Sequence, residues 1–276
     1  MKHTLTITLL LVVLFFVAQV IGLGIIDGYL DKEETVVDGV VVTNITWQAL
    51  PYDVERPAFE EKTSFLPIFL IILGATAVLL ILMKFKMFRL WTFWYFISVW
   101  FCLMIAFYVF FGEQAAFLLA GAIAAIKVWW RNVILHNTTE LLIYGGLAAV
   151  FVPFLNLFSM SILLLLISVY DAIAVWRTKH MVDMAEAQTK IKLFAGLFIP
   201  YGNKKAVLGG GDIGFPLFFG GVILKQFGWM SALIVTFCVT LALLILLLHS
   251  KKNTYYPAMP FLSAGCFVGL FLLWLL

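Results

Sequence analysis

Long apolar stretches alternate with short polar ones along almost the whole chain. Because a bilayer core about 30 Å thick needs roughly 20 apolar residues per helix, this pattern predicts membrane-spanning helices. Nine segments meet the criterion, and the fourth and fifth are the shortest. They lie near residues 4–26, 65–85, 90–111, 114–130, 139–156, 158–177, 205–226, 228–248 and 256–275. The sequence therefore predicts an all-α polytopic membrane protein with nine transmembrane helices.

The basic residues predict how these helices are oriented. With the N-terminus in the cytoplasm, all but four of the 18 Lys and Arg residues fall in inner connections, the exceptions being Lys32, Arg56, Lys62 and Lys225. Since inner loops carry the excess of Lys and Arg, we expect a cytoplasmic N-terminus and an outer C-terminus. The first apolar run is longer than the about 7–15 residues of a signal-peptide core, so we expect this helix to be retained.

Two connections are longer than the others, an outer one near residues 27–64 and an inner one at 178–204. The inner loop divides the chain into a six-helix part, 1–177, and a three-helix part, 205–276. Within the loop, residues 181–194 mix apolar and charged side chains. This mixture fits either a helix lying on the membrane surface or a solvated linker.

Composition supports the membrane assignment and excludes other classes. Hydrophobic residues make up 64% of the chain and charged residues 12%, against about 45–50% and about 25% in soluble domains. A net charge of +3, with basic residues scattered between apolar runs, gives no indication of a nucleic-acid partner. The three cysteines lie in apolar runs without a CxxC pair, and the four histidines lie at segment ends or in loops. We therefore expect no disulfide, metal or cofactor, and assign the histidines no chemistry.

Two acidic residues remain inside the predicted spans once Glu140 is placed at a helix end. They are Asp171 in the sixth span and Asp212 in the seventh. An ionisable side chain at membrane depth costs roughly 3 kcal/mol or more, and so marks a functional site by default. Asp171 precedes Arg177 by six residues, and Asp212 follows Lys205 by seven. At 1.5 Å per residue, both acids are therefore about 9–10 Å from the inner face.

Carboxylates at matching depth on consecutive helices can face each other. Two such groups within a few ångströms retain one proton between them and titrate as a pair. Aspartic proteases use this arrangement: one carboxylate activates water and its protonated partner polarises the amide carbonyl. The sequence thus predicts a catalytic pair, Asp171 and Asp212.

Short motifs surround these acids and open the last span. Tyr170-Asp171 lies in the sixth span, Gly209-Gly210-Gly211-Asp212 opens the seventh, and Pro257-Ala258-Met259-Pro260 opens the ninth. In this order the set resembles the presenilins and signal peptide peptidases, the GxGD intramembrane aspartyl proteases. The resemblance implies cleavage within transmembrane helices of other membrane proteins, with Asp171 and Asp212 catalytic. It also implies a substrate site formed by the remaining motif residues, Tyr170, Gly209, Gly210, Gly211, Pro257, Ala258 and Met259.

Details of the motifs indicate which branch of the family the chain resembles. Met259 departs from the leucine usual in the family, a near-isosteric apolar exchange. The predicted orientation and Pro260 favour the presenilin branch, and the short inner loop favours a microbial, archaeal-type homologue in a prokaryotic cell membrane. An oligomer is compatible with these features.

The glycines have two interpretations. They allow close approach of a substrate backbone, or they pack helices through small residues; with Asp212 beside them we favour the first. We further expect the stretch from Lys205 to Leu208 to be extended and to bind an unwound substrate by strand addition. Pro257 suits the first turn of the ninth helix, whereas Pro260 is expected to leave backbone groups unpaired near the site.

Two other functions use the same acids. A transporter or channel would employ Asp171 and Asp212 to relay protons or bind cations, although inverted repeats and further polar pathway residues are missing from the pattern. A prepilin-type peptidase shares a GxGD motif but leaves the segment Pro257–Met259 without a role.

Overall fold

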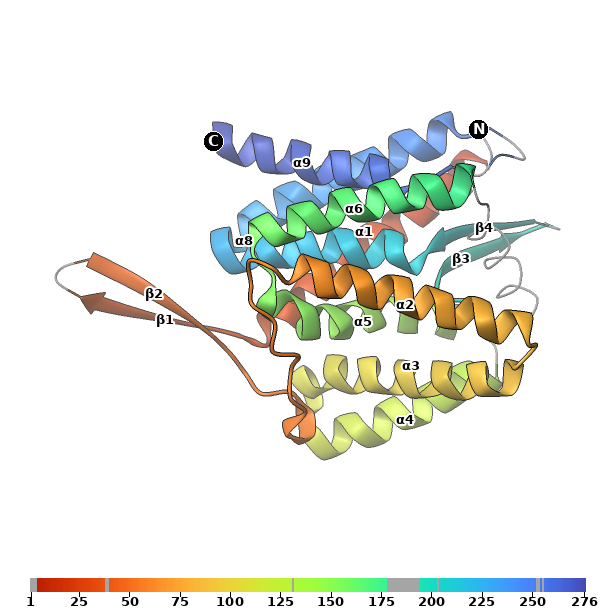
Figure 1. Ribbon diagram of the computed structural model, residues 1–276, viewed down its shortest axis with the longest axis horizontal. Helices are drawn as coiled ribbons and strands as arrows, with labels where there is room; N and C mark the ends of the chain where they lie inside the picture. The colour runs from red at the N-terminus through yellow and green to blue at the C-terminus, as the bar shows by residue number, and fades with distance from the viewer. Residues whose placement is uncertain are drawn as a thin grey trace.

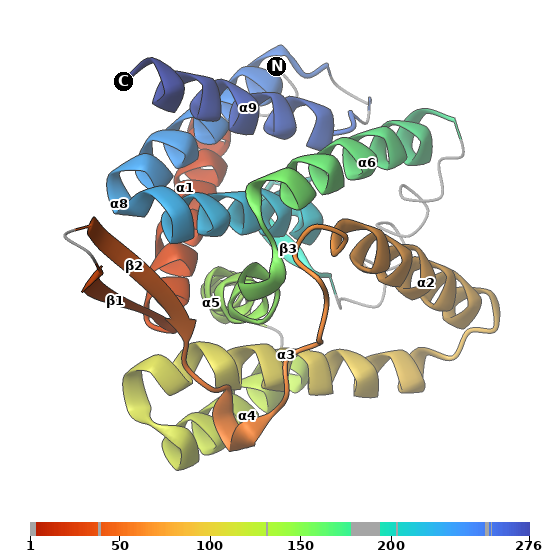
Figure 2. The same ribbon diagram turned by 60° about the vertical axis from the view of Figure 1, so that its left-hand side comes forward.

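The structure, a computed structural model, describes residues 4–37, 40–130, 132–177, 194–202, 204–251, 254 and 256–276. Within these residues the chain is predominantly helical (Figures 1 and 2). The helices are α1 Leu5–Asp27, α2 Phe65–Lys84, α3 Phe88–Phe111, α4 Glu113–Trp129, α5 Val133–Phe151, α6 Leu157–Trp176, α8 Gly210–His249 and α9 Met259–Leu275. Residues 181–193, interpreted above as a surface helix or a linker, lie outside the described part of the chain.

Two antiparallel hairpins lie at opposite ends of the helical bundle (Figure 1). One, β1 Leu30–Val37 with β2 Val40–Trp47, projects from the bundle. The other, β3 Gly196–Tyr201 with β4 Lys204–Gly209, lies against it. The prediction of a helix over 205–226 was therefore wrong for residues 205–209. That segment is the extended stretch expected before Asp212, and α8 begins only at Gly210.

Helix α8 is two helices joined at a sharp reversal. Gly228 has φ 82° and ψ −176°, a conformation outside the helical region and open in practice only to glycine. The chain turns back there, so that the second half returns toward the end of the bundle where the first began (Figure 1). The two halves correspond to the predicted segments 205–226 and 228–248.

Capping residues explain where α5 and α6 begin. Asn132 accepts hydrogen bonds from the backbone N–H groups of Ile134 and Leu135, at 2.8 and 3.3 Å, so α5 starts six residues before the predicted 139. Asn156 forms a capping box with Ser159 at the start of α6. In both places an asparagine side chain satisfies N–H groups that a helix start leaves unpaired.

Helix α1 lies at the centre of the bundle, packed against α5 and α8. Its Phe15, Ala18 and Leu23 are fully buried. Helices α1 and α5 approach closely through glycine, since a Cβ added to Gly145 would lie 3.1 Å from the Cα of Gly22. Small residues at such crossings let helices pack through van der Waals contact, as is usual inside membranes.

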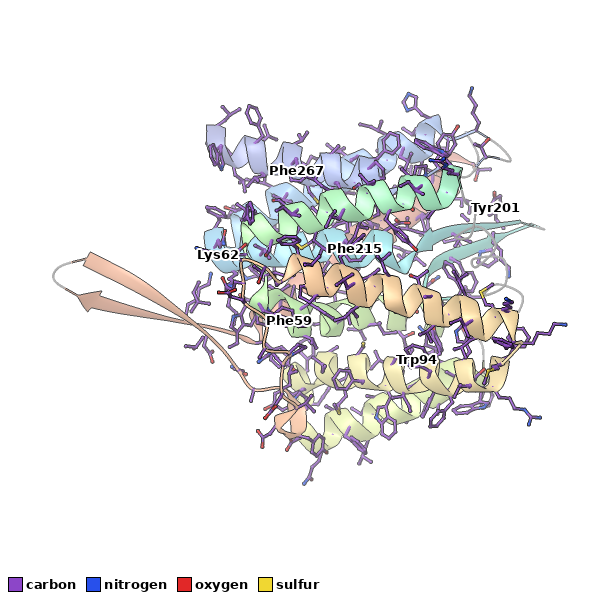
Figure 3. All side chains as sticks on the ribbon, viewed as in Figure 1. Phe59, Lys62, Trp94, Tyr201, Phe215 and Phe267 are labelled. Atoms are coloured by element: carbon purple, nitrogen blue, oxygen red, sulfur yellow. The ribbon has the colours of Figure 1, made fainter. Side chains whose placement is uncertain are left out.

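The outer surface of the bundle is apolar. Six helices of the described residues are long and apolar enough to cross a membrane, and α9 is a shorter apolar helix. Side chains cover the outside of the helices (Figure 3). The exposed large apolar ones include Leu70, Phe93, Leu118, Leu165 and Phe237. An exposed apolar surface of this extent suits contact with lipid. The chain is an integral, multi-pass membrane protein.

Candidate active site

Asp171 lies in α6 and points at the first turn of α9. It is only 4% exposed, and its Oδ2 accepts a hydrogen bond from the Met259 N–H at 3.0 Å. The Ala258 N–H also donates to this carboxylate. Because the first N–H groups of a helix have no partner within it, Asp171 caps α9 from a different helix.

Neighbouring contacts fasten α6 to α9 at this level. One turn before the acid, the Ser168 and Ser263 hydroxyls are 2.8 Å apart and hydrogen bonded. The position of Asp171 relative to α9 is thus fixed by two contacts, its own hydrogen bond to Met259 and the bond between Ser168 and Ser263.

Asp212 is the third residue of α8 and is partly exposed. Its carboxylate accepts a hydrogen bond from the N–H of Gly209, the residue that precedes the helix. From α1, the buried Gln19 Nε2 donates to the carbonyl of Ile213 at 2.8 Å. The Gly209 amide thus binds Asp212, and α1 binds the backbone of the next residue, Ile213.

The two carboxylates lie near each other, but the matching depth predicted for them does not explain this proximity, because it assumed that the residues of β4 were helical. Helices α6 and α8 are in contact, and the two carboxylates are close enough to interact electrostatically. Asp171 accepts hydrogen bonds from the N–H groups of Ala258 and Met259, which belong to the last motif. Asp212 accepts one from the N–H of Gly209, in its own motif. The three sequence motifs thus converge on one pair of acids.

The remaining motif residues occupy different places. Tyr170 turns toward α2, where its ring meets Phe69 edge-on with centroids 6.4 Å apart. Pro257 and Met259 are buried around Asp171. The expectation for the prolines was wrong, because Pro257 precedes α9 and Pro260 is its second residue. At that position a proline disrupts no hydrogen bond of the helix.

The hairpin beside Asp212 has a defined register. Gly210 N–H donates to Ala195 O at 3.1 Å, and the next pairs are Gly196 with Gly209 and Leu197 with Leu208. Antiparallel pairs alternate between bonded and non-bonded, so Leu208 is bonded to β3 whereas Val207 is not. Pro200, which has no N–H, falls in a non-bonded pair with Lys205, in agreement with this register. The main-chain groups of Val207 and Lys205 therefore point away from β3.

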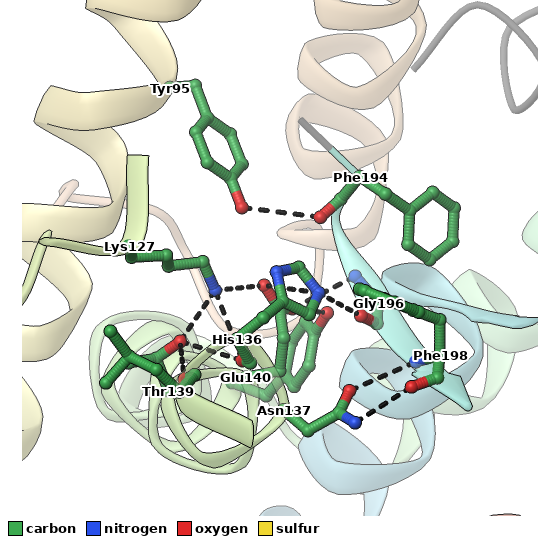
Figure 4. Close-up of polar contacts among 11 residues, drawn as sticks. Tyr95, Lys127, His136, Asn137, Thr139, Glu140, Phe194, Gly196 and Phe198 are labelled. Carbon is green, nitrogen blue, oxygen red and sulfur yellow. Dashed lines mark hydrogen bonds and ion pairs between the residues drawn. The ribbon is translucent and has the colours of Figure 1, made fainter. Parts of the chain in front are cut away.

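Sequence reasoning missed a buried polar cluster on α5. Glu140 lies inside this helix rather than at its end, is 1% exposed, and pairs with Lys127 of α4 at 2.6 Å. His136 and Asn137 bind the backbone of β3 (Figure 4). The sequence feature that could have revealed it is Asn132, a residue type that favours the N-cap position. A helix starting after Asn132 places Glu140 about two turns inside α5.

Comparison with known proteins agrees with this fold. The fold is similar to that of a presenilin family intramembrane aspartate protease solved in two crystal forms, C222 and P2. For the C222 form the TM-score is 0.65 at 19% identity, covering 96% of this chain and 97% of that one. For the P2 form the TM-score is 0.65 at 19% identity, covering 95% of both chains. No protein of curated function matches the chain.

A family model supplies the assignment. The model described as signal-peptide peptidase, presenilin aspartyl protease matches residues 40–210, more than half of the chain, including Asp171 and the first two glycines before Asp212. The chain belongs to the signal-peptide peptidase and presenilin aspartyl protease family.

Proposed function

We propose that the chain is an intramembrane endopeptidase that hydrolyses peptide bonds within transmembrane helices, with Asp171 and Asp212 as its catalytic pair. The observation that best supports this proposal is that the two acids lie on helices in contact, α6 and α8, with Asp171 bound by the N–H groups that open α9 and Asp212 bound by the Gly209 N–H. Such a pair retains one proton, which supplies an acid and a base in the same place.

The reaction follows from this pairing. The ionised carboxylate accepts a proton from water as the water oxygen attacks the amide carbon, while the protonated partner donates a hydrogen bond to the carbonyl oxygen. A proton then passes to the amide nitrogen as the C–N bond breaks. The side chains of the chain supply both the acid and the base, so the mechanism needs no cofactor.

The substrate must unwind before water can reach a peptide bond, because a helix shields its own backbone. Unpaired backbone groups in an apolar site cost several kcal/mol each and need new partners. Val207 and Lys205 offer outward main-chain groups on β4, the strand that leads into Asp212. We infer that the substrate docks there by strand addition, between Gly209–Gly211 and the segment Pro257–Met259.

The proposed topology has nine spans: α1 to α6, the two halves of α8, and α9. The N-terminus faces the cytoplasm and the C-terminus faces outward, in the cell membrane of a prokaryote. In this arrangement residues 1–177 carry Asp171 and residues 205–276 carry Asp212, joined by the inner loop 178–204. The termini lie at opposite ends of the bundle (Figure 1), as an odd number of spans requires.

The test is cleavage of a single-span membrane protein by the purified chain, with the products identified by mass spectrometry. Asp171→Asn and Asp212→Asn should each abolish cleavage, because an amide can neither share the proton nor act as a base. The exposed Glu55→Gln serves as the matched control and should remain active. Substantial turnover in either aspartate variant, with thermal unfolding unchanged, would refute the assignment. Proton flux into liposomes without any cleavage would instead favour the channel.

A further inference from the structure

The outer edge of β3 is occupied by side chains of α5. Asn137 Nδ2 donates to the Phe198 carbonyl at 2.8 Å, and Asn137 Oδ1 accepts from the Phe198 N–H at 3.1 Å (Figure 4). One amide side chain thus makes both hydrogen bonds that a neighbouring strand would make to that residue. Asn137 takes the place of a strand at this edge.

Two further α5 residues continue the same edge at Gly196. Glu140 Oε2 accepts from the Gly196 N–H at 3.0 Å, and His136 Nε2 lies 2.9 Å from the Gly196 carbonyl. Gly196 and Phe198 are two residues apart, so their main-chain groups point to the same side of β3. Four backbone groups in succession are therefore bound by three side chains of one helix.

The α5 side chains at this edge are held by a buried polar cluster, called the frame below, of Lys127, Thr139, Glu140 and Tyr144. Lys127 Nζ binds Glu140 Oε1 at 2.6 Å and Thr139 Oγ1 at 2.8 Å, and the Lys127 and Glu140 side chains are each 1% exposed. The Tyr144 hydroxyl donates to the other oxygen of Glu140. A buried charge pair whose remaining hydrogen-bonding positions are filled resists rearrangement. The α5 side chains are thus held in place before any substrate arrives.

The frame also touches the turn before Asp212. Tyr144 packs on Gly210, because a Cβ added there would lie 2.7 Å from its hydroxyl oxygen. Gly210 in turn donates to Ala195 at the start of β3. Helix α5 is therefore joined both to the hairpin and to the first turn of α8.

These contacts assign a different role to each edge of the hairpin. The β3 edge is filled from α5, whereas the outward groups of Val207 and Lys205 on β4 are not used by β3. We propose that Asn137 is a positioning residue, which together with His136 and Glu140 fixes the hairpin so that β4 presents its edge to an unwound substrate. The role in substrate binding rests on the proposed function, but the fixing of the hairpin does not.

Hydrogen exchange tests the fixing directly. In Asn137→Leu, which keeps the side-chain size but removes both hydrogen bonds, amides of residues 196–199 and 201 should exchange about two- to ten-fold faster, as expected for one or two lost hydrogen bonds. Amides of β1 and β2 should not change. The adjacent, exposed Thr138→Val is the matched control and should exchange as the unaltered protein does.

Kinetics test the role in substrate docking. Because Gln19 of α1 holds the first turn of α8 at the Ile213 carbonyl, independently of the hairpin, Asn137→Leu should raise KM several-fold while kcat changes by less than about two-fold. A carboxylate-directed inhibitor should bind as before. Combined with Val207→Pro, which removes the outward N–H of β4, Asn137→Leu should add little, because both act on one docking step. Should Asn137→Leu fail to fold, Asn137→Asp keeps the acceptor and loses the donor, and should show a smaller change in the same direction.

Unchanged exchange in the hairpin, or a loss of kcat with KM unaltered, would overturn the proposal. Failure of the unaltered protein to cleave any single-span substrate would instead overturn the proposed function. In that event the exchange measurement still decides whether Asn137 holds the hairpin.

Discussion

At the scale of the residue, Gly210 and Gly211, two of the three glycines before Asp212, have different surroundings. A Cβ on Gly210 would lie 2.7 Å from the Tyr144 hydroxyl oxygen, a side chain already bound to Glu140. A Cβ on Gly211 would meet only Phe215, at 3.4 Å, and Gly211 is exposed. One glycine is therefore required by packing, and the other is free to accommodate a substrate.

Alanine substitutions separate these two uses. Gly210→Ala should lower the free energy of unfolding by about 1–3 kcal/mol through overpacking, measured by denaturant titration in detergent micelles. Gly211→Ala should leave stability unchanged or slightly higher, since alanine is the better helix former. If the glycines admit the substrate backbone, Gly211→Ala should nevertheless reduce cleavage. Full activity of Gly211→Ala would assign this glycine no part in substrate approach.

At the scale of the element, strand addition to β4 can be tested by comparing proline substitutions at two adjacent residues, Val207 and Leu208. Val207→Pro removes an N–H that points away from β3, whereas Leu208→Pro removes one that pairs with Leu197. Both variants should lose most cleavage, but only Leu208→Pro should open the hairpin in hydrogen exchange. Val207→Thr keeps the N–H and should cleave normally. Turnover by Val207→Pro at the rate of Val207→Thr would exclude docking on this edge.

The reversal inside α8 depends on the backbone of one glycine. At Gly228 nothing lies within 4 Å of an added Cβ, so the only obstacle to a side chain is the conformation itself. Gly228→Ala should lower the free energy of unfolding by about 1–3 kcal/mol. Gly74 in α2 is the control, since an added Cβ there also meets nothing within 4 Å, and alanine in a regular helix is stabilising by roughly 0.5–1 kcal/mol. Equal stability of the two variants would contradict this account of the reversal.

At the scale of the whole molecule, the proposed orientation can be read from two exposed positions at opposite ends of the bundle. In a background with Cys102, Cys238 and Cys266 replaced, Glu55→Cys should react with a membrane-impermeant maleimide in intact cells. Arg177→Cys should react only after permeabilisation, because the proposed orientation places it inside. The opposite labelling pattern would reverse the orientation and leave the fold untouched.

Much of the helical arrangement was predictable because a membrane span depends only on a continuous run of apolar residues of sufficient length. The reversal at Gly228 lies at the boundary predicted between two such runs. Asp171 and Asp212 were recognisable as acids within apolar runs, but the depth estimated for Asp212 assumed a helix where the structure has the strand β4. The start of α8 was predicted in two ways, since hydropathy placed residues 205–209 in a helix whereas the first four of them were also expected to be extended. Pairing with β3 decides for the strand. The early start of α5 was recognisable only through its cap at Asn132.

The sequence by itself determined that the chain crosses a membrane several times and carries two acids where charge is unfavourable, since both conclusions depend on local composition and depth. Only the tertiary structure decided what surrounds those acids. Asn137 and Phe198 are 61 positions apart, and Asp171 and Met259 are 88 apart. Hydrogen bonds between side chains and distant backbone groups leave no periodic trace in the sequence. Which edge of the hairpin is filled, and which N–H groups hold each carboxylate, is therefore settled by packing alone.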